Sequence, residues 1–325
     1  MSLPSLTTRL FPKNQGADAY AVTGLAARCD WVLLSDWHAP QIKLVKHRSD
    51  RPRHIFMSLR APFVALLHFA QQILPQLTEP FVLISGSEDI TLPQQTDQRW
   101  RQYNSEENTA IRAILNHPLM LRWFVENLDD ATVDKMQPLP LGLIDVKQAA
   151  DWPDVPRLSE RPLRVLCAHR LRDGPQWEVR RHVSALARGP WKAWTTVLED
   201  DIPEADFLDL LQQHAFVICA QGGGIDPSPK AWQSLMYGAV PLYSAPSLRR
   251  AYNQLPTIHV PNWTAESITL PRLQQWHAWA CPRMDERSAR RSLRERLSLD
   301  YWWRQIEEPI RQARPFCLPA SGRIC

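Results

Sequence analysis

The most informative stretch of this 325-residue sequence is Phe216-Val-Ile-Cys-Ala-Gln-Gly-Gly-Gly-Ile-Asp-Pro-Ser-Pro-Lys-Ala-Trp-Gln-Ser-Leu-Met-Tyr-Gly-Ala-Val-Pro-Leu242. An apolar run over residues 215–220 predicts a buried strand, and the glycines at 222–224 follow it as a loop. A helix then ends at Gly238, and residues 239–242 predict the next strand. The order strand, glycine loop, helix, strand is typical of a parallel α/β fold.

The start of this helix has the features of an anion-binding site. Ser228 is a good N-cap and Pro229 fits the first helical position, so free backbone N–H groups would point back at the glycine loop. Lys230 places a cation in the first turn, where the helix dipole disfavours positive charge unless an anion lies nearby. We therefore predict a bound phosphate or diphosphate. The alternative is a loose glycine turn beside a solvated lysine.

Short apolar runs alternate with helical patterns along most of the chain, which favours an α/β fold. In the first half, we predict strands at 31–34, 81–84 and 139–144, and helices at 63–77 and about 109–128, the latter interrupted by Pro118. In the second half, we predict strands at 163–168 and 215–220, and helices at 176–187 and around 207–211.

A segment with three prolines, residues 150–162, has neither helical nor strand periodicity and predicts an interdomain linker. A chain of this length is roughly twice a typical domain of about 150 residues. We therefore expect two Rossmann-like domains that face a cleft, over residues 1–155 and 156–325, with a helix closing the chain.

Composition narrows the class of protein. Hydrophobic residues make up 44%, charged residues 22%, and the net charge is +4, which together exclude a disordered chain and argue against a dedicated nucleic-acid binder. The six cysteines form no CxxC pair and no zinc-type spacing, so we expect reduced thiols in a cytoplasmic protein. We find neither a signal peptide nor an apolar stretch near the about 20 residues of a membrane span.

An Arg-rich helical segment, residues 285–314, comes near the end of the chain. Its apolar stripe consists of Leu293, Leu297, Tyr301, Ile306 and Ile310. The stripe predicts packing on the protein, with the eight arginines of the segment forming a solvated face. The alternative is that the helix from Arg287 to Arg314 contacts nucleic acid or the inner face of a membrane.

The run Gly224–Leu242 resembles the donor-binding segment of GT-B glycosyltransferases, in particular exostosin-like and α1,3-fucosyltransferase-like enzymes. In those enzymes a Lys or Arg and a following acidic residue flank a helix that ends in Gly-x-x-Pro. Three segments are similar to parts of exostosin-like bacterial proteins: Leu83–Asp89, Trp123–Asn127 and Leu139–Leu143. The resemblance spans about residues 80–260 and is most specific over 222–242.

The resemblance implies a glycosyltransferase that moves a sugar from a nucleotide-sugar donor to a hydroxyl group of a glycan or other acceptor, in glycan or polysaccharide synthesis. The C-terminal domain would hold the donor and the N-terminal domain the acceptor. The nucleotide sugar would be a co-substrate, and we expect no cofactor and no metal, because no DxD-like motif stands at a credible metal position. The alternatives are a nucleotide-sugar epimerase of the same fold, a non-catalytic protein that binds a phosphorylated ligand, and a nucleic-acid-binding protein.

The predicted donor site combines the glycine loop with cations from the preceding strand and helix. Its residues are Arg170, Arg181, Gly222, Gly223, Gly224, Asp226, Ser228, Lys230 and Gln233. Arg170 follows a strand, at the edge where open α/β sheets bind ligands. Arg180 and Arg181 lie on the next helix and either hold a diphosphate or form ordinary surface charge. The family often has a ribose-binding glutamate where this chain has Gln233, so a neutral hydrogen bond or Asp226 would take that role.

An inverting transfer also needs a group that accepts the proton of the acceptor hydroxyl, on the N-terminal side of the cleft. Asp36 with His38, Glu88 with Asp89, and Asp145 each follow a predicted strand. We predict that Asp89 is the base and that its neighbour Glu88 raises the pKa of Asp89. The alternative for each is a turn or cap residue. A retaining enzyme would need no such base.

Overall fold

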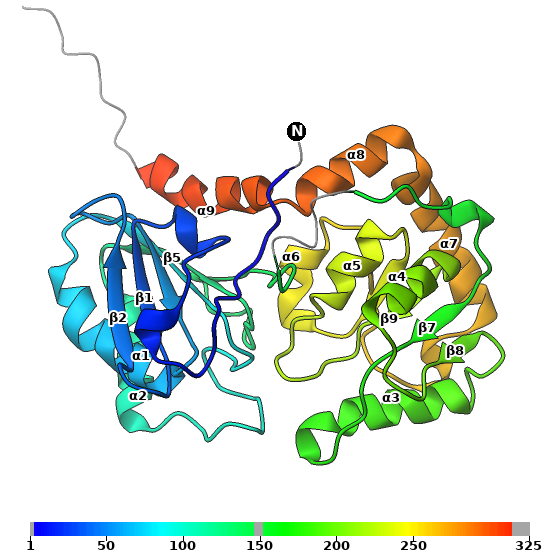
Figure 1. Cartoon of the computed structure of the whole chain (residues 1–325), viewed down its shortest axis with the longest axis horizontal. Helices are drawn as coiled ribbons and strands as arrows, with labels where there is room; N and C mark the ends of the chain where they lie inside the picture. Colours follow the sequence, from blue (N-terminus) through cyan, green and yellow to red (C-terminus); the bar gives the residue numbers. More distant parts are fainter. Residues whose placement is uncertain (1–2, 146–151, 314–325) are drawn as a thin grey trace, which may run out of the picture.

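The computed structural model describes residues 3–145 and 152–313, and its strands form two separate sheets (Figure 1). The first sheet has the order β2-β1-β3-β4-β5-β6. Its strands are β1 (Trp31–Ser35), β2 (Ile42–Lys46), β3 (His54–Ser58), β4 (Phe81–Gly86), β5 (Met120–Val125) and β6 (Met136–Pro138). β2 pairs antiparallel with β1, and the other neighbours pair in parallel.

The second sheet is parallel throughout and has the order β11-β10-β9-β7-β8. Its strands are β7 (Val165–Cys167), β8 (Thr195–Val197), β9 (Phe216–Ile218), β10 (Val240–Tyr243) and β11 (Ile258–His259). The helices around it include α3 (Glu178–Arg188), α4 (Glu204–Gln213), α5 (Lys230–Met236), α6 (Arg249–Tyr252) and α7 (Leu270–Asp285). Two α/β halves, each with a buried sheet, confirm the predicted fold class.

The helices of the first half end earlier than the sequence pattern predicts. The predicted helix over 63–77 is α1 (Pro62–His68), followed by a π turn and a 3-10 turn that reach Gln76. The second helix, α2 (Ser105–Asn116), ends before Pro118, and the prediction that it continues to residue 128 is wrong. After the proline the chain forms β5 instead, because its run of large apolar residues fits a mostly buried strand.

One further prediction in the first half is wrong, and two strands of this half were not predicted. Residues 139–144 form no strand apart from a single bridge between Gly142 and Thr7, and the strand of this region is β6, three residues earlier. The half-exposed β2 and β3, the next strand along the chain, were not predicted. β2 lies at the sheet edge and carries lysines, so it lacks the continuous apolar run of a central strand.

The start of α5 also differs from the prediction. The helix begins at Lys230, with Pro229 at the N-cap position, and no side chain caps it. The hydroxyl of Ser228 lies 2.9 Å from the Tyr252 hydroxyl, and that contact replaces the expected cap. The predicted stop is confirmed, because Gly238 has a φ of 81° just after α5.

The Arg-rich segment forms two helices, α8 (Arg287–Arg296) and α9 (Leu299–Ala313), and α9 crosses back to the first half, where it contacts β4 and β5 (Figure 1). Leu293, Ile306 and Ile310 are buried, as the stripe predicts. Arg290 is not part of a solvated face, since it donates 2.6 Å to the Leu235 carbonyl at the end of α5. Arg314 lies outside the described residues.

The N-terminal segment lies between the two halves and connects them. Leu299 donates its backbone N–H to the Pro4 carbonyl at 2.8 Å, and Ser5 bridges to Ser298. The division into domains at residues 155 and 156 stays a prediction. The two sheets lie on either side of that position, while α9 returns to the first sheet. Residues 150 and 151 of the predicted linker lie outside the described residues.

Candidate functional site

Polar residues from both halves line a cavity of about 290 Å³ between them. The first half contributes Arg9, Asp89, Glu126 and Asn127, and the second half contributes the glycine loop, Asp226, Lys230 and Arg180. Asp89 and Glu126 follow β4 and β5, at the carboxyl edge of the first sheet. The glycine loop follows β9, at the carboxyl edge of the second, so the cavity lies where open α/β sheets bind ligands.

The glycine loop is approached closely by side chains of the first half. Asn127 Oδ1 accepts hydrogen bonds from the backbone N–H groups of Ile225 at 2.9 Å and Asp226 at 3.0 Å. A Cβ on Gly224 would clash with the Asn127 side chain, and one on Gly223 would clash with Asp89. A side chain at either position would therefore displace the side chains of the first half that lie against the loop.

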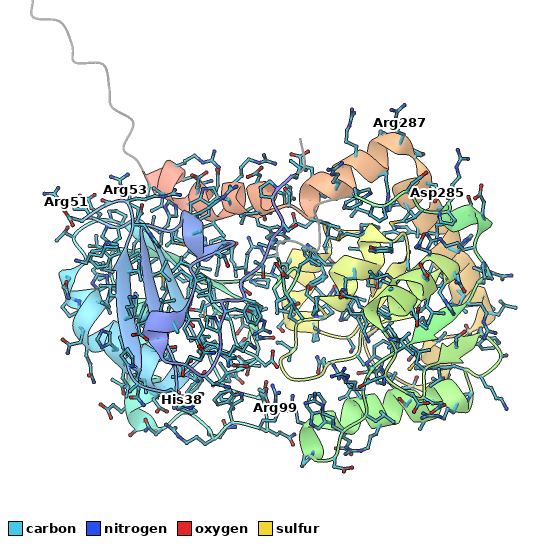
Figure 2. The ribbon with its side chains drawn as sticks, in the orientation of Figure 1. His38, Arg51, Arg53, Arg99, Asp285 and Arg287 are labelled. Atoms are coloured by element: carbon cyan, nitrogen blue, oxygen red, sulfur yellow. The ribbon has the colours of Figure 1, made fainter. Side chains whose placement is uncertain are left out.

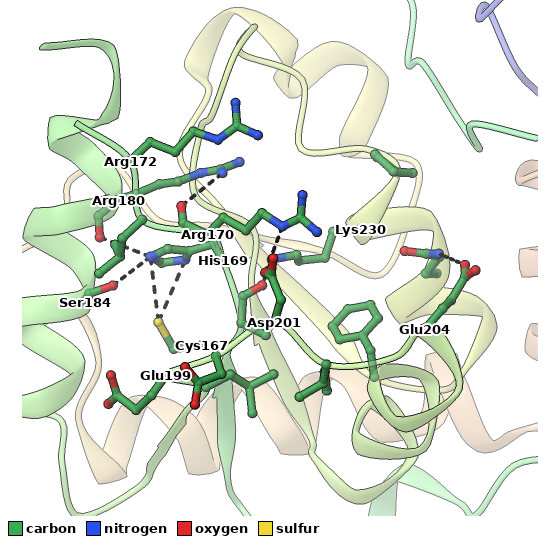
Figure 3. A pocket seen from close by; sticks show the side chains of 18 of the residues that line it. Cys167, His169, Arg170, Arg172, Arg180, Ser184, Glu199, Asp201, Glu204 and Lys230 are labelled. Atoms are coloured by element: carbon green, nitrogen blue, oxygen red, sulfur yellow. Dashed lines mark hydrogen bonds and ion pairs between the residues drawn. The ribbon is translucent and has the colours of Figure 1, made fainter. Parts of the chain in front are cut away.

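A second, larger cavity of about 830 Å³ lies beside the first, next to β7, β8 and the start of α5. Figure 3 shows the cationic side chains of Arg170, Arg172, Arg180 and Lys230 close together in it. Arg170 forms a 2.8 Å ion pair with Asp201, and both side chains are mostly exposed. Among the described residues, Arg172, Arg180 and Lys230 form no ion pair with a carboxylate.

Burial, and after it the positive charge of neighbouring side chains, lowers the pKa values of the basic groups in this cavity. Lys230 donates a hydrogen bond to the Ala168 carbonyl, and its pKa is lowered to about 8 by burial and by the charge of Arg180. The pKa of Arg180 is lowered to about 10 by burial and by Arg172. His169 Nε2 lies 2.9 Å from the Ser184 hydroxyl, and burial and Lys230 lower the pKa of His169 to about 3, so the ring is neutral. An anion in this cavity would relieve the repulsion.

Arginines of both halves meet at Trp177, just before α3. The guanidinium of Arg99 lies 5.5 Å from the Trp177 ring centre, and those of Arg172 and Arg180 lie 5.0 and 5.1 Å away. Figure 2 shows Arg99 at the edge of the first half, pointing toward the start of α3. Gln98 also donates its backbone N–H to Gln176 Oε1 at 2.8 Å. These contacts join the two halves beside the cavities.

Asp89 lies in the cavity, but its surroundings differ from the expectation. Arg9 and Arg99 bind its two oxygens at 2.8 and 3.0 Å. Burial alone would raise the pKa of Asp89, but the two arginines lower it below its ordinary value, so the expected rise is wrong. Glu88 lines neither cavity; its carboxylate forms an ion pair with Arg60 and accepts the backbone N–H of Asp89 at 3.0 Å. Opposite charges, rather than a second carboxylate, therefore dominate around Asp89.

Glu126 has all of its hydrogen-bonding capacity engaged. Its Oε2 accepts from the Thr8 hydroxyl at 2.6 Å and the Ser87 backbone N–H at 2.9 Å, and its Oε1 lies 3.1 Å from Arg9. Burial raises the pKa of Glu126, although Arg9 opposes this rise. Glu126 thereby ties the N-terminal segment to the ends of β4 and β5.

The predicted donor-site residues divide between the two cavities. The glycines, Asp226 and Ser228 line the smaller cavity, Arg170 lines the larger, and Lys230 and Gln233 line both. Arg181 lines neither of these two cavities and donates to the backbone carbonyls of Arg172 and Gly174 at 2.8 and 3.0 Å. Its neighbour Arg180 lines both.

The other predicted strand-end candidates lie outside these cavities. Asp36 is buried and accepts from the Tyr20 hydroxyl at 2.5 Å and the His38 backbone N–H at 2.7 Å, which together lower its pKa despite its burial. This matches the turn-residue alternative. Asp145 follows β6 after several residues and lines neither cavity.

The sequence analysis did not identify Arg9 in the smaller cavity, nor Arg99 and Trp177 beside the cavities. Arg9 lies in an irregular N-terminal segment, Arg99 lies in a loop without a motif, and Trp177 ends a 3-10 turn at the start of a predicted helix. Asn127 is the last residue of Trp123–Asn127, one of the segments similar to parts of exostosin-like bacterial proteins, so the sequence did contain a signal for this residue.

Neither a metal cluster nor a membrane span is found in the described part of the chain. Within residues 3–145 and 152–313, no three side chains of His, Cys, Asp or Glu are grouped as metal ligands. In the same ranges, no helix combines the length and apolar character needed to cross a bilayer. Cys29, Cys167, Cys219 and Cys281 are unpaired, and Cys317 and Cys325 lie outside the described residues.

Comparisons with known proteins find distant structural similarity alone. No family model matches the sequence, and no curated protein matches it. The structure of CalG4, the calicheamicin glycosyltransferase, aligns at 10% identity with a TM-score of 0.33, covering 82% of this chain and 77% of its own. The structure of Arabidopsis thaliana UGT89C1 complexed with UDP-L-rhamnose aligns at 13% identity with a TM-score of 0.34, covering 80% and 72%. Similarity at this level assigns no activity to this chain.

Proposed function

We propose that this protein is a GT-B glycosyltransferase that moves a sugar from a nucleotide-sugar donor to a hydroxyl group of an acceptor, without a metal ion, in glycan or polysaccharide synthesis. The observation that carries the proposal is the group of Lys230, Arg172 and Arg180, none of which has a carboxylate ion-pair partner among the described residues. All three line the larger cavity, and Lys230 and Arg180 also line the smaller one. A diphosphate supplies the missing negative charge, and arginine can bind it through two parallel hydrogen bonds. The resemblance of Gly224–Leu242 to donor-binding segments supports a nucleotide sugar as its source.

The positions of the two cavities support the division of roles. The larger cavity lies within the second half and has room for a nucleotide, while the smaller one opens toward Arg9, Asp89 and Glu126 of the first half. We place the diphosphate at Lys230 and Arg180, which border both cavities, and the transferred sugar in the smaller cavity. Cations at this position would stabilise the charge that develops on the leaving diphosphate.

A panel of UDP- and GDP-sugars tests the proposal. We expect at least one of them to raise the melting temperature and to be slowly hydrolysed to nucleoside diphosphate, with water acting as the acceptor. Interconversion of two sugars would instead indicate an epimerase, and stabilisation without turnover would indicate a binding protein. Absence of any stabilisation by the panel or by UDP and GDP would contradict the donor site itself.

The remaining partners stay predictions. The exposed Arg287, at the start of α8, lies on the opposite edge of the molecule from Arg99 (Figure 2). Binding to anionic vesicles or to DNA that weakens with salt, and is lost when Arg287 and Arg291 are changed to Gln, would support a membrane or nucleic-acid contact. A cytoplasmic location, also expected from the cysteines, needs a localisation experiment.

A further inference from the structure

Three carboxylates line the smaller cavity, and their partners differ. Asp89 is bound by two arginines, and Glu126 accepts two hydrogen bonds and an ion pair. Asp226 uses its Oδ1 to accept from the Ser228 backbone N–H at 2.7 Å and the Tyr252 hydroxyl at 2.9 Å. Its Oδ2 is buried and has no hydrogen-bond partner among the described residues.

A buried carboxylate oxygen without a hydrogen-bond partner is costly, and this one belongs to a residue that lines a cavity, where a ligand can complete it. The two hydrogen bonds to Oδ1 fix the orientation of the carboxylate, so Oδ2 is held in one place. In the other two acids both oxygens have partners: an arginine binds each oxygen of Asp89, and hydrogen-bond donors and Arg9 bind the two oxygens of Glu126. A proton acceptor needs a lone pair that its own protein does not already use.

We propose that Asp226 Oδ2, rather than Asp89, accepts the proton of the acceptor hydroxyl during sugar transfer. This inference rests on the proposed glycosyltransferase function. The hydroxyl oxygen attacks the anomeric carbon of the donor, and the bond from that carbon to the phosphate oxygen breaks. The nucleoside diphosphate leaves with the electron pair, and the hydroxyl proton passes to Asp226 Oδ2. Lys230 and Arg180 line the same cavity and receive the negative charge.

The charges around Asp226 suit this role. Burial raises its pKa to about 7, and the nearby Glu126 adds to the rise, while the donors Ser228 and Tyr252 oppose it. Arg9 on the N-terminal segment and the Cys219 thiol at the end of β9 also face Asp226. A base with a pKa near neutrality combines a deprotonated fraction at working pH with a real affinity for the proton. Asp89, held ionised by two arginines, has much less affinity for it.

The decisive variant is Asp226→Asn, measured on the nucleotide sugar that the panel identifies. Asparagine retains an Oδ1 acceptor for Ser228 and Tyr252 but cannot take the proton. We expect turnover to fall by about 10²–10⁴-fold, with the affinity for UDP or GDP changed by less than about threefold and the melting temperature retained. Asp89→Asn should lower turnover less than Asp226→Asn does.

A second measurement remains informative if Asp226→Asn fails to fold. The turnover of the wild type should fall on the acid side with an apparent pKa near that of Asp226. Tyr252→Phe removes a hydrogen-bond donor that stabilises the ionised carboxylate, so the pKa of Asp226 should rise. The acid limb of the plot of turnover against pH should therefore shift to higher pH, with little change in the turnover on the alkaline plateau. A merely structural role for Asp226 would not move this limb.

The outcomes separate the two proposals. If the wild type turns over a nucleotide sugar but folded Asp226→Asn keeps more than a tenth of that turnover, the role of Asp226 is overturned while the glycosyltransferase proposal stands. An unshifted acid limb in Tyr252→Phe also overturns it. If the wild type turns over no nucleotide sugar, the proposed function fails first.

Discussion

The smaller cavity has an N-terminal wall, formed by the first half of the chain, and a C-terminal wall, formed by the second half, and the two walls differ in how their charges are paired. On the N-terminal wall, Asp89 lies between Arg9 and Arg99, and Glu126 shares Arg9. On the C-terminal wall, Lys230 and Arg180 have no carboxylate partner among the described residues, and their pKa values are lowered. The arginines and carboxylates of the first wall are therefore paired with one another, whereas Lys230 and Arg180 of the second are not, and an anionic ligand would pair them. This difference in charge pairing distinguishes residues that stabilise the fold from residues that we expect to bind a ligand.

The largest expected effect on stability comes from removing an arginine from the N-terminal wall, where the charges are paired. Arg9→Met removes the partner of Glu126, whose side chain is 1% exposed, and one of the two partners of Asp89. We expect a loss of about 3 kcal/mol in the free energy of unfolding, the lower end of the range for a buried pair that loses one member. Denaturant titration measures it.

Arg304→Met is the matched control, because Arg304 and Glu295 form an ion pair of 2.5 Å with both side chains about half exposed. It should cost less than about 1 kcal/mol, as exposed pairs do. Equal losses in the two variants would mean that the N-terminal wall is not a structural unit.

Removing a cation from the C-terminal wall should weaken ligand binding without lowering the stability of the protein. Lys230→Met removes a cation that burial disfavours, so the unfolding free energy without ligand should stay the same or rise. Binding of UDP or GDP should weaken by about 1.5–3 kcal/mol, the range for hydrogen bonds to charged groups. Calorimetry and thermal unfolding measure the two effects.

The exposed Lys192 provides the control, since Lys192→Met should change neither quantity. A Lys230→Met protein that binds nucleoside diphosphate normally would remove this residue from the donor site.

The smallest effect is the pH dependence of binding. An anion binds the protonated form of Lys230, and the pKa of this group in the free protein is about 8. Affinity for UDP should therefore be highest below pH 8 and fall by about tenfold between pH 7 and 9, since about 1.4 kcal/mol corresponds to one pKa unit.

The same titration of Lys230→Met should lose most of this dependence. A wild-type affinity that is constant from pH 7 to 9 would show that the charge of Lys230 does not contribute to binding.

Prediction from the sequence worked where the signal is local. The second half repeats strand, loop and helix with clear apolar runs, and β7, β9, β10, α3, α4 and α5 lie where those runs occur. β8, β11, α6 and α7 were not predicted. The first half was harder, since Pro118 separates a helix from a buried strand of similar hydrophobicity, and the edge strand β2 carries lysines. Hydrophobicity alone cannot distinguish these structures, because the choice depends on what each segment packs against.

The sequence by itself determined the α/β class, the glycine loop, the helix stop at Gly238 and the position of Lys230 beside the loop. These features follow from periodicity and from backbone preferences within a few residues. Only the tertiary structure decided which charges meet, because Arg9 reaches Asp89 and Asn127 reaches the loop at Ile225 across long stretches of chain. The same packing gave Asp89 two arginines and left Asp226 Oδ2 without a partner. A carboxylate's affinity for a proton depends on burial and on neighbouring charges, and both are set by the packing of the two halves.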